Sequence, residues 1–184
     1  MDALTVLQKR VSSAILEEPA PTQNQLKEMY KSALRAPDHG ALTPWRFLTI
    51  EGDARHAFSE ALYNIRKSEG VTGRSLEKMK TIALRAPMVI VSIANLKESN
   101  KIPDVEQEWS AVAATQNLIL AAEAQGLGAI WRTGWPTFHP QVNKLLGLTE
   151  NEKIVAYIYT GQRPKERRPI TPLDIDDYVS FWQG

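Results

Sequence analysis

The chain has 184 residues, a length typical of one domain, and its 22 basic and 21 acidic side chains leave a net charge of +1. This balance argues against a nucleic-acid partner and against a polybasic membrane-binding surface. The absence of cysteine excludes disulfides and thiolate chemistry, and three scattered histidines argue against a metal site. We therefore predict a single cytoplasmic domain over residues 1–184, because neither a secretory signal nor an apolar run of the ~20 residues that span a membrane is visible.

Helix-forming patterns recur along the chain. Thr22 and Gln25 form a capping-box pattern before an apolar face, and Pro37 prevents that helix from continuing. A long stretch over 103–125 is apolar on nearly all sides, which predicts a buried central helix. Three more helices are predicted: one capped by Asp53, a shorter one capped by Ser75 that ends before Pro87, and one over Pro140–Leu146 that ends at Gly147.

Short segments rich in β-forming residues lie between these helices. Because helices and strands interleave, an α/β or α+β domain is predicted. No strand is followed by a Gly-x-Gly-x-x-Gly motif or a P-loop, and the closely spaced Gly126 and Gly128 stand at a helix end rather than at a helix start. The predicted strands are Arg46–Ile50, Met88–Ala94, Gly128–Trp131 and Ile154–Thr160.

The composition changes after Gly161. Residues 162–172 contain three prolines and four basic side chains, which predicts an extended and exposed path. The last residues are again apolar, and a tail of that kind is expected to dock on a protein surface. The apolar side chains in question are Ile175, Tyr178, Val179, Phe181 and Trp182.

No side chain stands out as an acid, a base or a nucleophile. The sequence lacks a Gly-x-Ser-x-Gly motif and a recognisable Ser/His/Asp order, and its closely spaced carboxylates fit solvated faces. We therefore assign no catalytic residue and attribute the chemistry to a bound cofactor.

Three segments have the composition of a cofactor site. Arg10 and Ser12 follow a short apolar helix and suit a phosphate clamp, although cations at a helix end also fit a purely electrostatic role. Arg35 and His39 lie in a loop that can present donors to a planar ligand, but the loop is equally a helix-to-strand connection. The stretch 121–134 places two glycines and a Trp-Arg-Thr-Gly run after the buried helix, which fits either ligand contacts or a helix cap followed by a core strand.

Together these segments resemble the nitroreductase family of FMN-dependent oxidoreductases, in its minimal single-domain form. The resemblance implies an α+β, nitroreductase-like fold with a central, mainly antiparallel sheet flanked by helices. It also implies a homodimer with FMN at the subunit interface and a C-terminal extension, 161–184, that reaches the partner. The matching motifs are Arg10-Val11-Ser12, Arg35-Ala36-Pro37-Asp38-His39, Pro44-Trp45-Arg46-Phe47 and Gln125-Gly126-Leu127-Gly128-Ala129-Ile130-Trp131-Arg132-Thr133-Gly134.

The resemblance further implies roles for individual residues. Arg35 would contact FMN, and His39 would reach the flavin of the other subunit. The other FMN contacts that it implies are Arg10, Val11, Ser12, Trp131, Arg132 and Thr133. A nicotinamide-binding stretch is implied over Ala121, Ala122, Glu123, Ala124, Gln125 and Gly126.

The sequence departs from the family pattern at two places. The family's N-terminal Arg-Arg-Ser-x-Arg pattern is here Arg10-Val11-Ser12-Ser13-Ala14, so two arginines are missing. Arg35 and Arg132 therefore gain importance as partners of the FMN phosphate. Where the family usually has an amide side chain before Pro-Trp, this chain has Thr43. One polar contact to the flavin ring therefore lacks its usual residue.

The implied function is the ping-pong reduction of a small-molecule electron acceptor. NADH or NADPH passes a hydride to FMN and leaves, and a nitroaromatic, a quinone or another flat electrophile takes its place. Three alternatives stay open. One is a flavin enzyme of this fold with another substrate, such as a dehydrogenase or an aldehyde reductase. The others are a flavin-binding module without turnover and a flavin-free interaction module.

Overall fold

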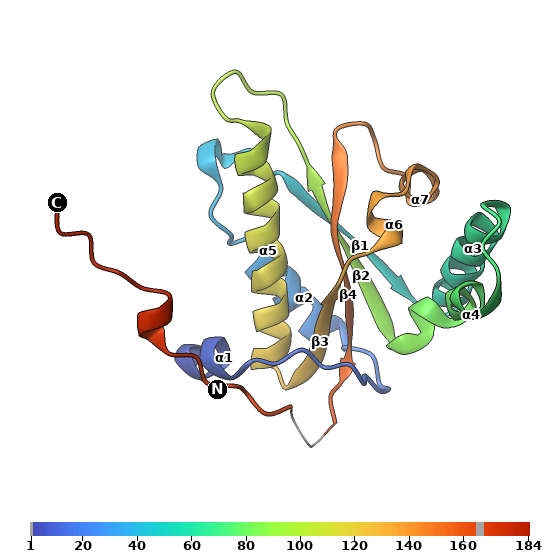
Figure 1. Cartoon of the computed structure of the whole chain (residues 1–184), viewed down its shortest axis with the longest axis horizontal. Helices are drawn as coiled ribbons and strands as arrows, with labels where there is room; N and C mark the ends of the chain where they lie inside the picture. The colour runs from blue at the N-terminus through green and yellow to red at the C-terminus, as the bar shows by residue number, and fades with distance from the viewer. Residues whose placement is uncertain (1, 165–167) are drawn as a thin grey trace.

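A computed structural model describes residues 2–164 and 168–184 and contains one antiparallel sheet in the order β1-β2-β4-β3 (Figure 1). β2 and β4 are central, and β1 and β3 form the edges. The strands are β1 (Trp45–Glu51), β2 (Met88–Asn95), β3 (Leu127–Arg132) and β4 (Glu152–Gln162). Each contains the segment that the sequence predicted, extended by one or two residues at its ends, so all four predicted strands are confirmed.

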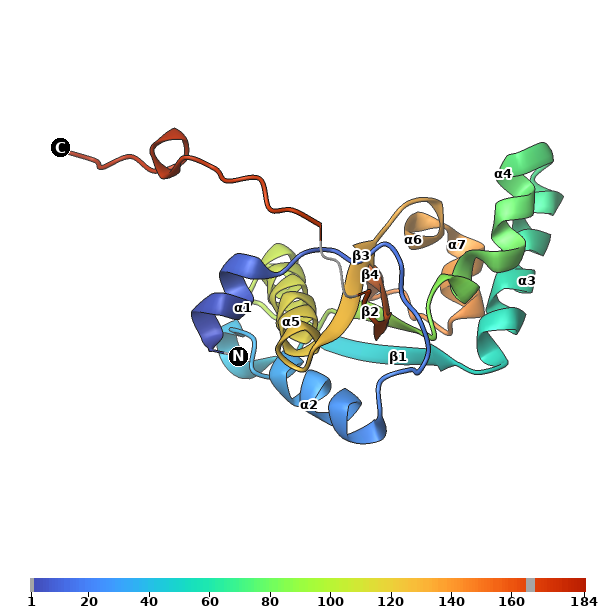
Figure 2. The same cartoon turned by 90° about the horizontal axis from the view of Figure 1, so that it is seen from below.

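Helices cover both faces of this sheet (Figures 1 and 2). α2 and α5 pack on one face, and α3, α6 and α7 lie on the other, so that two apolar clusters flank the strands. The α-helices are α1 (Ala3–Lys9), α2 (Gln23–Ala33), α3 (Ala54–Ser68), α4 (Gly73–Glu77), α5 (Asp104–Ala124), α6 (Trp135–Phe138) and α7 (Pro140–Leu145). Short 3₁₀ helices are η1 (His39–Ala41), η2 (Lys78–Arg85) and η3 (Ile175–Asp177).

The predicted helix signals had mixed outcomes. Thr22 forms the predicted capping box, since its backbone N–H donates to Gln25 Oε1 at 3.0 Å and its hydroxyl accepts from the Gln25 N–H at 3.3 Å. The capping role of Asp53 is wrong, because its own backbone is helical and its side chain makes no capping bond. Ser75 lies inside α4, which begins two residues earlier, at Gly73, where the backbone reverses with a φ of +65°.

The central helix α5 packs one side on the sheet, but it is not buried all round as the sequence predicted, since nine of its 21 residues are buried and Trp109 and Val112 are exposed. The helix ends where the sequence predicted: Gln125 is its C-cap, and Gly126 follows in the left-handed region with a φ of +82°. Helix α6 was not predicted, because four residues are too short to give a periodic pattern. Trp45 is buried in the cluster beside α5, as the core interpretation expected.

The C-terminal arm, residues 168–184, extends away from the body of the chain (Figures 1 and 2). The apolar side chains of the arm were predicted to dock on a protein surface, but they do not pack on their own subunit, since Phe181 and Trp182 are 86% and 92% exposed. Lys165, Glu166 and Arg167 of the predicted extended run lie outside the described residues. The apolar arm therefore needs a surface other than its own subunit if it is to be covered.

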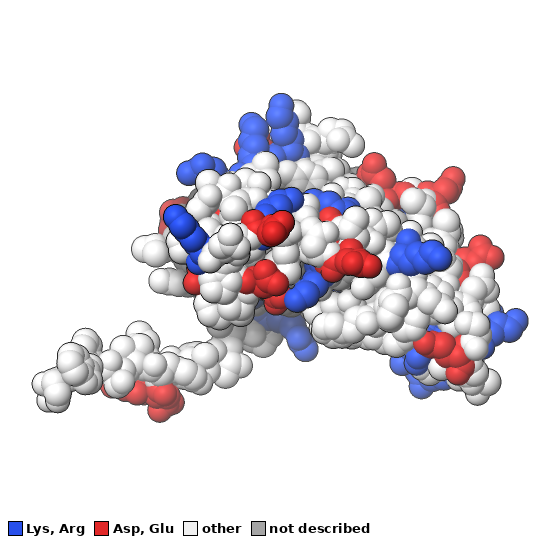
Figure 3. All heavy atoms as spheres, turned by 90° about the horizontal axis from the view of Figure 1, so that it is seen from above, with Lys and Arg blue, Asp and Glu red and all other residues white. Residues whose placement is uncertain are grey.

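Basic and acidic side chains are interspersed over the face drawn in Figure 3, and the arm there is mostly uncharged apart from one acidic group. That group consists of Asp174, Asp176 and Asp177. Within the described part of the chain, no helix combines the length and the hydropathy that a bilayer crossing requires.

Candidate functional site

The segment that follows α1 runs alongside β3. The backbone N–H of Ser13 donates to the carbonyl oxygen of Ala129 at 3.1 Å. Gly128 permits this close approach, since a Cβ there would lie 2.6 Å from Leu16 Cδ2 and 3.1 Å from Ser13 Cβ. The predicted contacts Val11 and Ser12 are thereby fixed beside the sheet edge.

A cavity of about 220 Å³ opens between this segment and the residues after β4. Val11 and Ser12 line it together with Arg163 and Arg168. Sequence reasoning missed these two arginines as site residues, because it used the proline-rich basic run only to predict an extended path. A hydroxyl and two guanidinium groups around one cavity form the donor set that a phosphate group requires.

Arg163 is held in place by a buried carboxylate. Its Nη1 donates to Glu123 Oε1 at 2.7 Å, and the Glu123 side chain is only 5% exposed. Glu123 belongs to the stretch predicted to bind nicotinamide, but in this structure it and Ala122 are buried. Ala121 and Ala124 of the same stretch border an open hollow between α1, α2 and α5, which Arg35 also lines.

His39 lies at the start of η1, 65% exposed at its side chain. Its Nδ1 and Glu106 Oε2 are 2.7 Å apart, which leaves Nε2 without a partner among the described residues. The preceding Asp38 shapes the loop, because its carboxylate accepts the backbone N–H groups of Leu42 and Thr43 at 3.2 and 2.7 Å. The loop thus presents one imidazole nitrogen outward, beside the exposed Trp109 of α5.

The remaining predicted contacts stand where β3 ends. Trp131 and Thr133 border a cavity of about 400 Å³ between α5, α6 and the start of β4. Arg132 and Thr133 border a smaller cavity on the other face of the sheet, where burial and the neighbouring Arg85 lower the pKa of Arg132. Gly134 follows with a φ of +120°, a conformation that suits only glycine and turns the chain into α6.

Within one chain these predicted residues do not share one cavity. The hollows that contain Arg35 and His39 are separate from the cavities beside β3. Arg10 caps the end of α1, where its N–H donates to the Val6 carbonyl at 3.1 Å. A single subunit therefore offers several partial surfaces rather than one closed ligand site.

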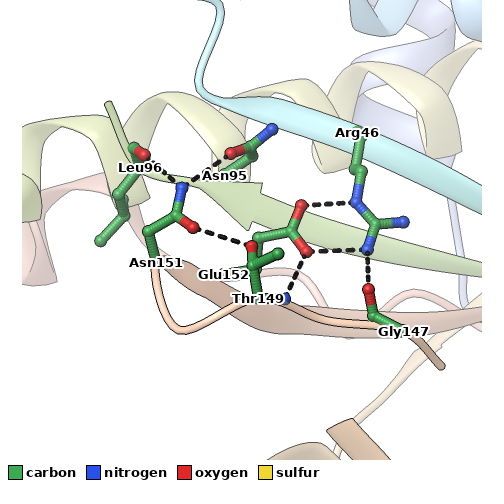
Figure 4. Close-up of polar contacts among 7 residues, drawn as sticks. All are labelled: Arg46, Asn95, Leu96, Gly147, Thr149, Asn151 and Glu152. Atoms are coloured by element: carbon green, nitrogen blue, oxygen red, sulfur yellow. Dashed lines mark hydrogen bonds and ion pairs between the residues drawn. The ribbon is translucent and has the colours of Figure 1, made fainter. Parts of the chain in front are cut away.

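Arg46, in the predicted Pro-Trp-Arg-Phe motif, has a structural partner (Figure 4). Its Nε and Nη2 donate to the Glu152 carboxylate at 2.5 and 2.8 Å. Glu152 also accepts the backbone N–H of Thr149 at 3.0 Å, and these bonds lower its pKa to about 2 against the opposing effect of burial. This ion pair connects β1 to the start of β4 and gives Arg46 a structural role.

The model of the nitroreductase family matches this chain from residue 7 to residue 162. The chain belongs to the nitroreductase family. Its relatives in that family include the Escherichia coli (strain K12) protein named "Putative NAD(P)H nitroreductase YdjA", which is 38% identical over 98% of both chains. A "Putative NAD(P)H nitroreductase" of Haemophilus influenzae is 34% identical over 98% of this chain and 100% of its own length.

Solved structures show the same nitroreductase-like fold. A nitroreductase-like family protein from Bacillus cereus covers all of this chain with a TM-score of 0.85 at 24% identity, and 97% of that chain is covered in return. A mutant of NfnB, named as an FMN- and NADPH-dependent nitroreductase from "sphigopyxis sp. strain HMH", gives a TM-score of 0.76 at 18% identity over the whole of both chains. The predicted family and α+β fold are therefore confirmed, and membership in the nitroreductase family identifies the chain as an oxidoreductase.

Proposed function

We propose that this nitroreductase-family chain binds FMN and uses NADH or NADPH to reduce flat electrophilic small molecules, such as nitroaromatics and quinones. The observation that carries the proposal is the cavity in which Val11 and Ser12 lie beside Arg163 and Arg168. Relatives named as NAD(P)H nitroreductases, and the FMN- and NADPH-dependent NfnB with the same fold, support the choice of cofactors.

The residues of this cavity fit the phosphate end of FMN. The two guanidinium groups supply positive charge, and the Ser12 hydroxyl supplies a further donor. The Glu123 carboxylate, which binds Arg163, orients one of these guanidinium groups before any ligand arrives. Trp131 and Arg132 end the neighbouring strand β3 and Thr133 follows it, and the ring system of FMN would lie there.

When bound, FMN would supply the redox chemistry, which is hydride transfer from the nicotinamide and electron transfer to the acceptor in ping-pong order. The protein's own residues bind the cofactor and the substrates and orient them. Arg132 places a fixed positive charge near the end of β3, where it favours a ligand that gains negative charge. The Glu106 contact fixes the His39 ring so that its Nε2 faces outward as a donor or acceptor.

The proposal includes a homodimer, with His39 reaching the flavin of the second subunit. Apolar side chains remain exposed on the outer surfaces of two helices, at Leu4 and Leu7 of α1 and at Trp109 and Val112 of α5. The exposed C-terminal arm adds to this uncovered apolar area. Large apolar side chains left exposed in this way are typical of a subunit interface. Together with the separate hollows around Arg35 and His39, it supports a site completed by a second copy.

The first test is the flavin content of the purified protein and of two variants. We expect a yellow protein that retains FMN, and Arg168→Ala and Arg35→Ala should each weaken FMN binding roughly tenfold or more, since each removes a charge-assisted contact. Lys31→Ala is the matched control, because Lys31 pairs with Glu28 on the exposed face of α2. A colourless protein that takes up no added FMN would refute the proposal.

The second test addresses turnover. Anaerobic mixing of the FMN-loaded protein with NADH or NADPH should bleach the visible flavin absorbance, and adding a quinone or a nitroaromatic should restore it. His39→Ala should slow the bleaching or loosen the flavin. If the flavin stays oxidised with both nucleotides, the protein binds flavin but lacks the proposed reductase activity.

A further inference from the structure

A cluster of four side chains joins the end of α3 to the segment that contains α6 and α7 (Figures 1 and 2). Glu69, the C-cap of α3, uses both of its carboxylate oxygens: Oε2 accepts from Arg66 Nη1 at 2.9 Å, and Oε1 lies 2.6 Å from His139 Nε2. The Trp135 ring completes the cluster, since its centre lies 4.7 Å from the Arg66 guanidinium carbon and 4.8 Å from the centre of the His139 ring. None of the four residues lines a cavity described above, so the cluster is separate from the candidate cofactor site.

His139 places this contact at the start of α7. Its backbone carbonyl accepts the N–H groups of Val142 and Asn143 at 3.0 Å each, and its side chain is 15% exposed. The segment 135–146 is bounded by two glycines in the left-handed region, Gly134 with a φ of +120° and Gly147 with a φ of +68°. Glycines at both ends are typical hinge positions, so the contact with α3 can decide how firmly this segment is held.

The second nitrogen of the His139 ring is buried among atoms that need a donor. Three buried side-chain atoms form no hydrogen bond within the described part of the chain, and all three lie on this segment: Thr137 Oγ1, His139 Nδ1 and Asn143 Oδ1. When Nε2–H donates to the carboxylate, a neutral ring leaves Nδ1 as an acceptor, like the Asn143 oxygen. His139 and Asn143 are four residues apart, a spacing that brings side chains to one helix face. A proton on Nδ1 would therefore supply the donor that these acceptors lack.

The contact with Glu69 is stronger when His139 is protonated. An ionised carboxylate at 2.6 Å attracts a charged imidazole, and the hydrogen bond between them becomes charge-assisted. Hydrogen bonds from Arg66 and then from His139 lower the pKa of Glu69, so the carboxylate stays ionised. Arg66 is the opposing charge, but the Trp135 ring packs against both groups, and the face of an aromatic ring attracts a cation.

The elements around this segment carry further titratable groups. They are Tyr157 of β4, Lys144 of α7, Arg85 of η2 and Arg132 of β3. The Tyr157 hydroxyl donates to the Pro136 carbonyl at 3.2 Å, and burial raises the pKa of Tyr157, so this group stays neutral. Lys144 is exposed to solvent, where its charge is screened, and the two arginines line the smaller cavity beside β3. The direct contact with Glu69 therefore dominates the electrostatics of His139.

We propose that Glu69 and His139 form a pH-dependent clasp, closed when His139 is protonated and loosened when it is neutral, that sets how firmly residues 135–146 are held against α3. Glutamate is ionised above pH ~4.5 and histidine changes its charge between pH 5 and 8. Both charges are therefore present near pH 5.5, and only the charge of Glu69 remains at pH 8. The clasp holds with or without the proposed function, because neither of its residues belongs to the proposed FMN site.

Hydrogen exchange followed by mass spectrometry tests the clasp on the full-length protein at pH 5.5 and at pH 8. After correction for the intrinsic pH dependence of exchange, the amides of residues 135–146 should be protected roughly tenfold more at pH 5.5, the effect of one charge-assisted hydrogen bond. Glu69→Gln should abolish this difference, because its amide keeps a hydrogen bond but carries no charge. His139→Gln should abolish it as well, and it tests the same pair if the first variant does not fold.

His56→Gln is the matched control, because His56 is an exposed histidine of α3 outside the cluster. It should keep the difference, and the amides of β2 should show none in any of these proteins. Equal protection of residues 135–146 at both pH values in wild type overturns the proposal, and so does a difference that survives in Glu69→Gln. A pH effect on β2 as large as that on residues 135–146 also overturns it, because global stability rather than the clasp would then respond to pH.

Discussion

Arg46 and Glu152 are 106 positions apart in the sequence and meet through two hydrogen bonds of 2.5 and 2.8 Å (Figure 4). The Glu152 side chain is 5% exposed and that of Arg46 is 33% exposed, so the pair is closed to solvent on the carboxylate side. Arg46 also donates to the Gly147 carbonyl at 3.4 Å. One guanidinium group thus connects edge strand β1, the end of α7 and the start of β4.

Removing the cation should destabilise the protein strongly. Arg46→Met leaves a buried carboxylate without its counter-ion, and we expect the free energy of unfolding to fall by about 3 kcal/mol. Lys31→Met is the control, because it breaks the exposed Lys31–Glu28 pair and should change stability by less than ~0.5 kcal/mol. Urea unfolding of both variants measures the difference. Equal effects would show that the Arg46–Glu152 pair contributes no more than a surface ion pair.

The same carboxylate predicts a specific pH dependence. The folded protein lowers the pKa of Glu152 from its usual 4.5 to about 2. A lowered pKa gives stability that is complete above pH ~4.5 and disappears as the pH falls towards ~2, by about 3 kcal/mol in total. Wild type should therefore exceed Glu152→Gln in stability at pH 7, and the gap should close between pH 4.5 and 2. A gap that is constant over this range would contradict the assignment.

The close packing around Gly128 leads us to expect that a substitution there affects both stability and FMN binding. An added Cβ would lie 2.6 Å from Leu16 Cδ2 and 2.9 Å from Arg163 Cβ, so Gly128→Ala must displace the segment that carries Ser12 or the residues after β4. We expect a loss of about 1–3 kcal/mol in stability together with weaker FMN binding. Thermal unfolding and flavin titration measure the two effects.

Gly126→Ala is the control for this substitution. Gly126 has a φ of +82° and open space around its Cβ position, so alanine there strains the backbone without displacing a neighbour. It should lower stability by about 1 kcal/mol and leave the FMN affinity unchanged. If both variants lose FMN equally, the loss follows from general destabilisation and the coupling through Gly128 is refuted.

Because the C-terminal arm is exposed in one subunit, we expect the proposed dimer to depend on the last aromatic residues of the arm. Serine substitutions at both Phe181 and Trp182 remove the two most exposed large apolar side chains and should weaken the proposed dimer roughly tenfold or more. Gln183→Ala, in the same arm, should have little effect. Sedimentation velocity over a range of protein concentrations measures the dissociation constant. An unchanged constant in the double variant would place the arm outside the interface.

Much of the fold could be predicted from local sequence patterns. The strands and the long helix α5 were predicted within a few residues, because alternating or continuous apolar runs and flanking glycines and prolines act over short distances. The capping box at Thr22 is local in the same sense, since its two partners are three residues apart. Asp53 and Ser75 failed as caps because the surrounding backbone, rather than residue type alone, decides whether a side chain reaches the first turn.

The sequence by itself also determined the family, since several weak motifs in a fixed order are specific together. Only the tertiary structure decided which distant side chains meet: Arg46 with Glu152, Arg163 with Ser12 around one cavity, and Arg85 with Arg132 around another. The physical reason is that strand order and register bring these residues together, while each arginine looks the same in the sequence whether it binds a carboxylate or lines an open cavity.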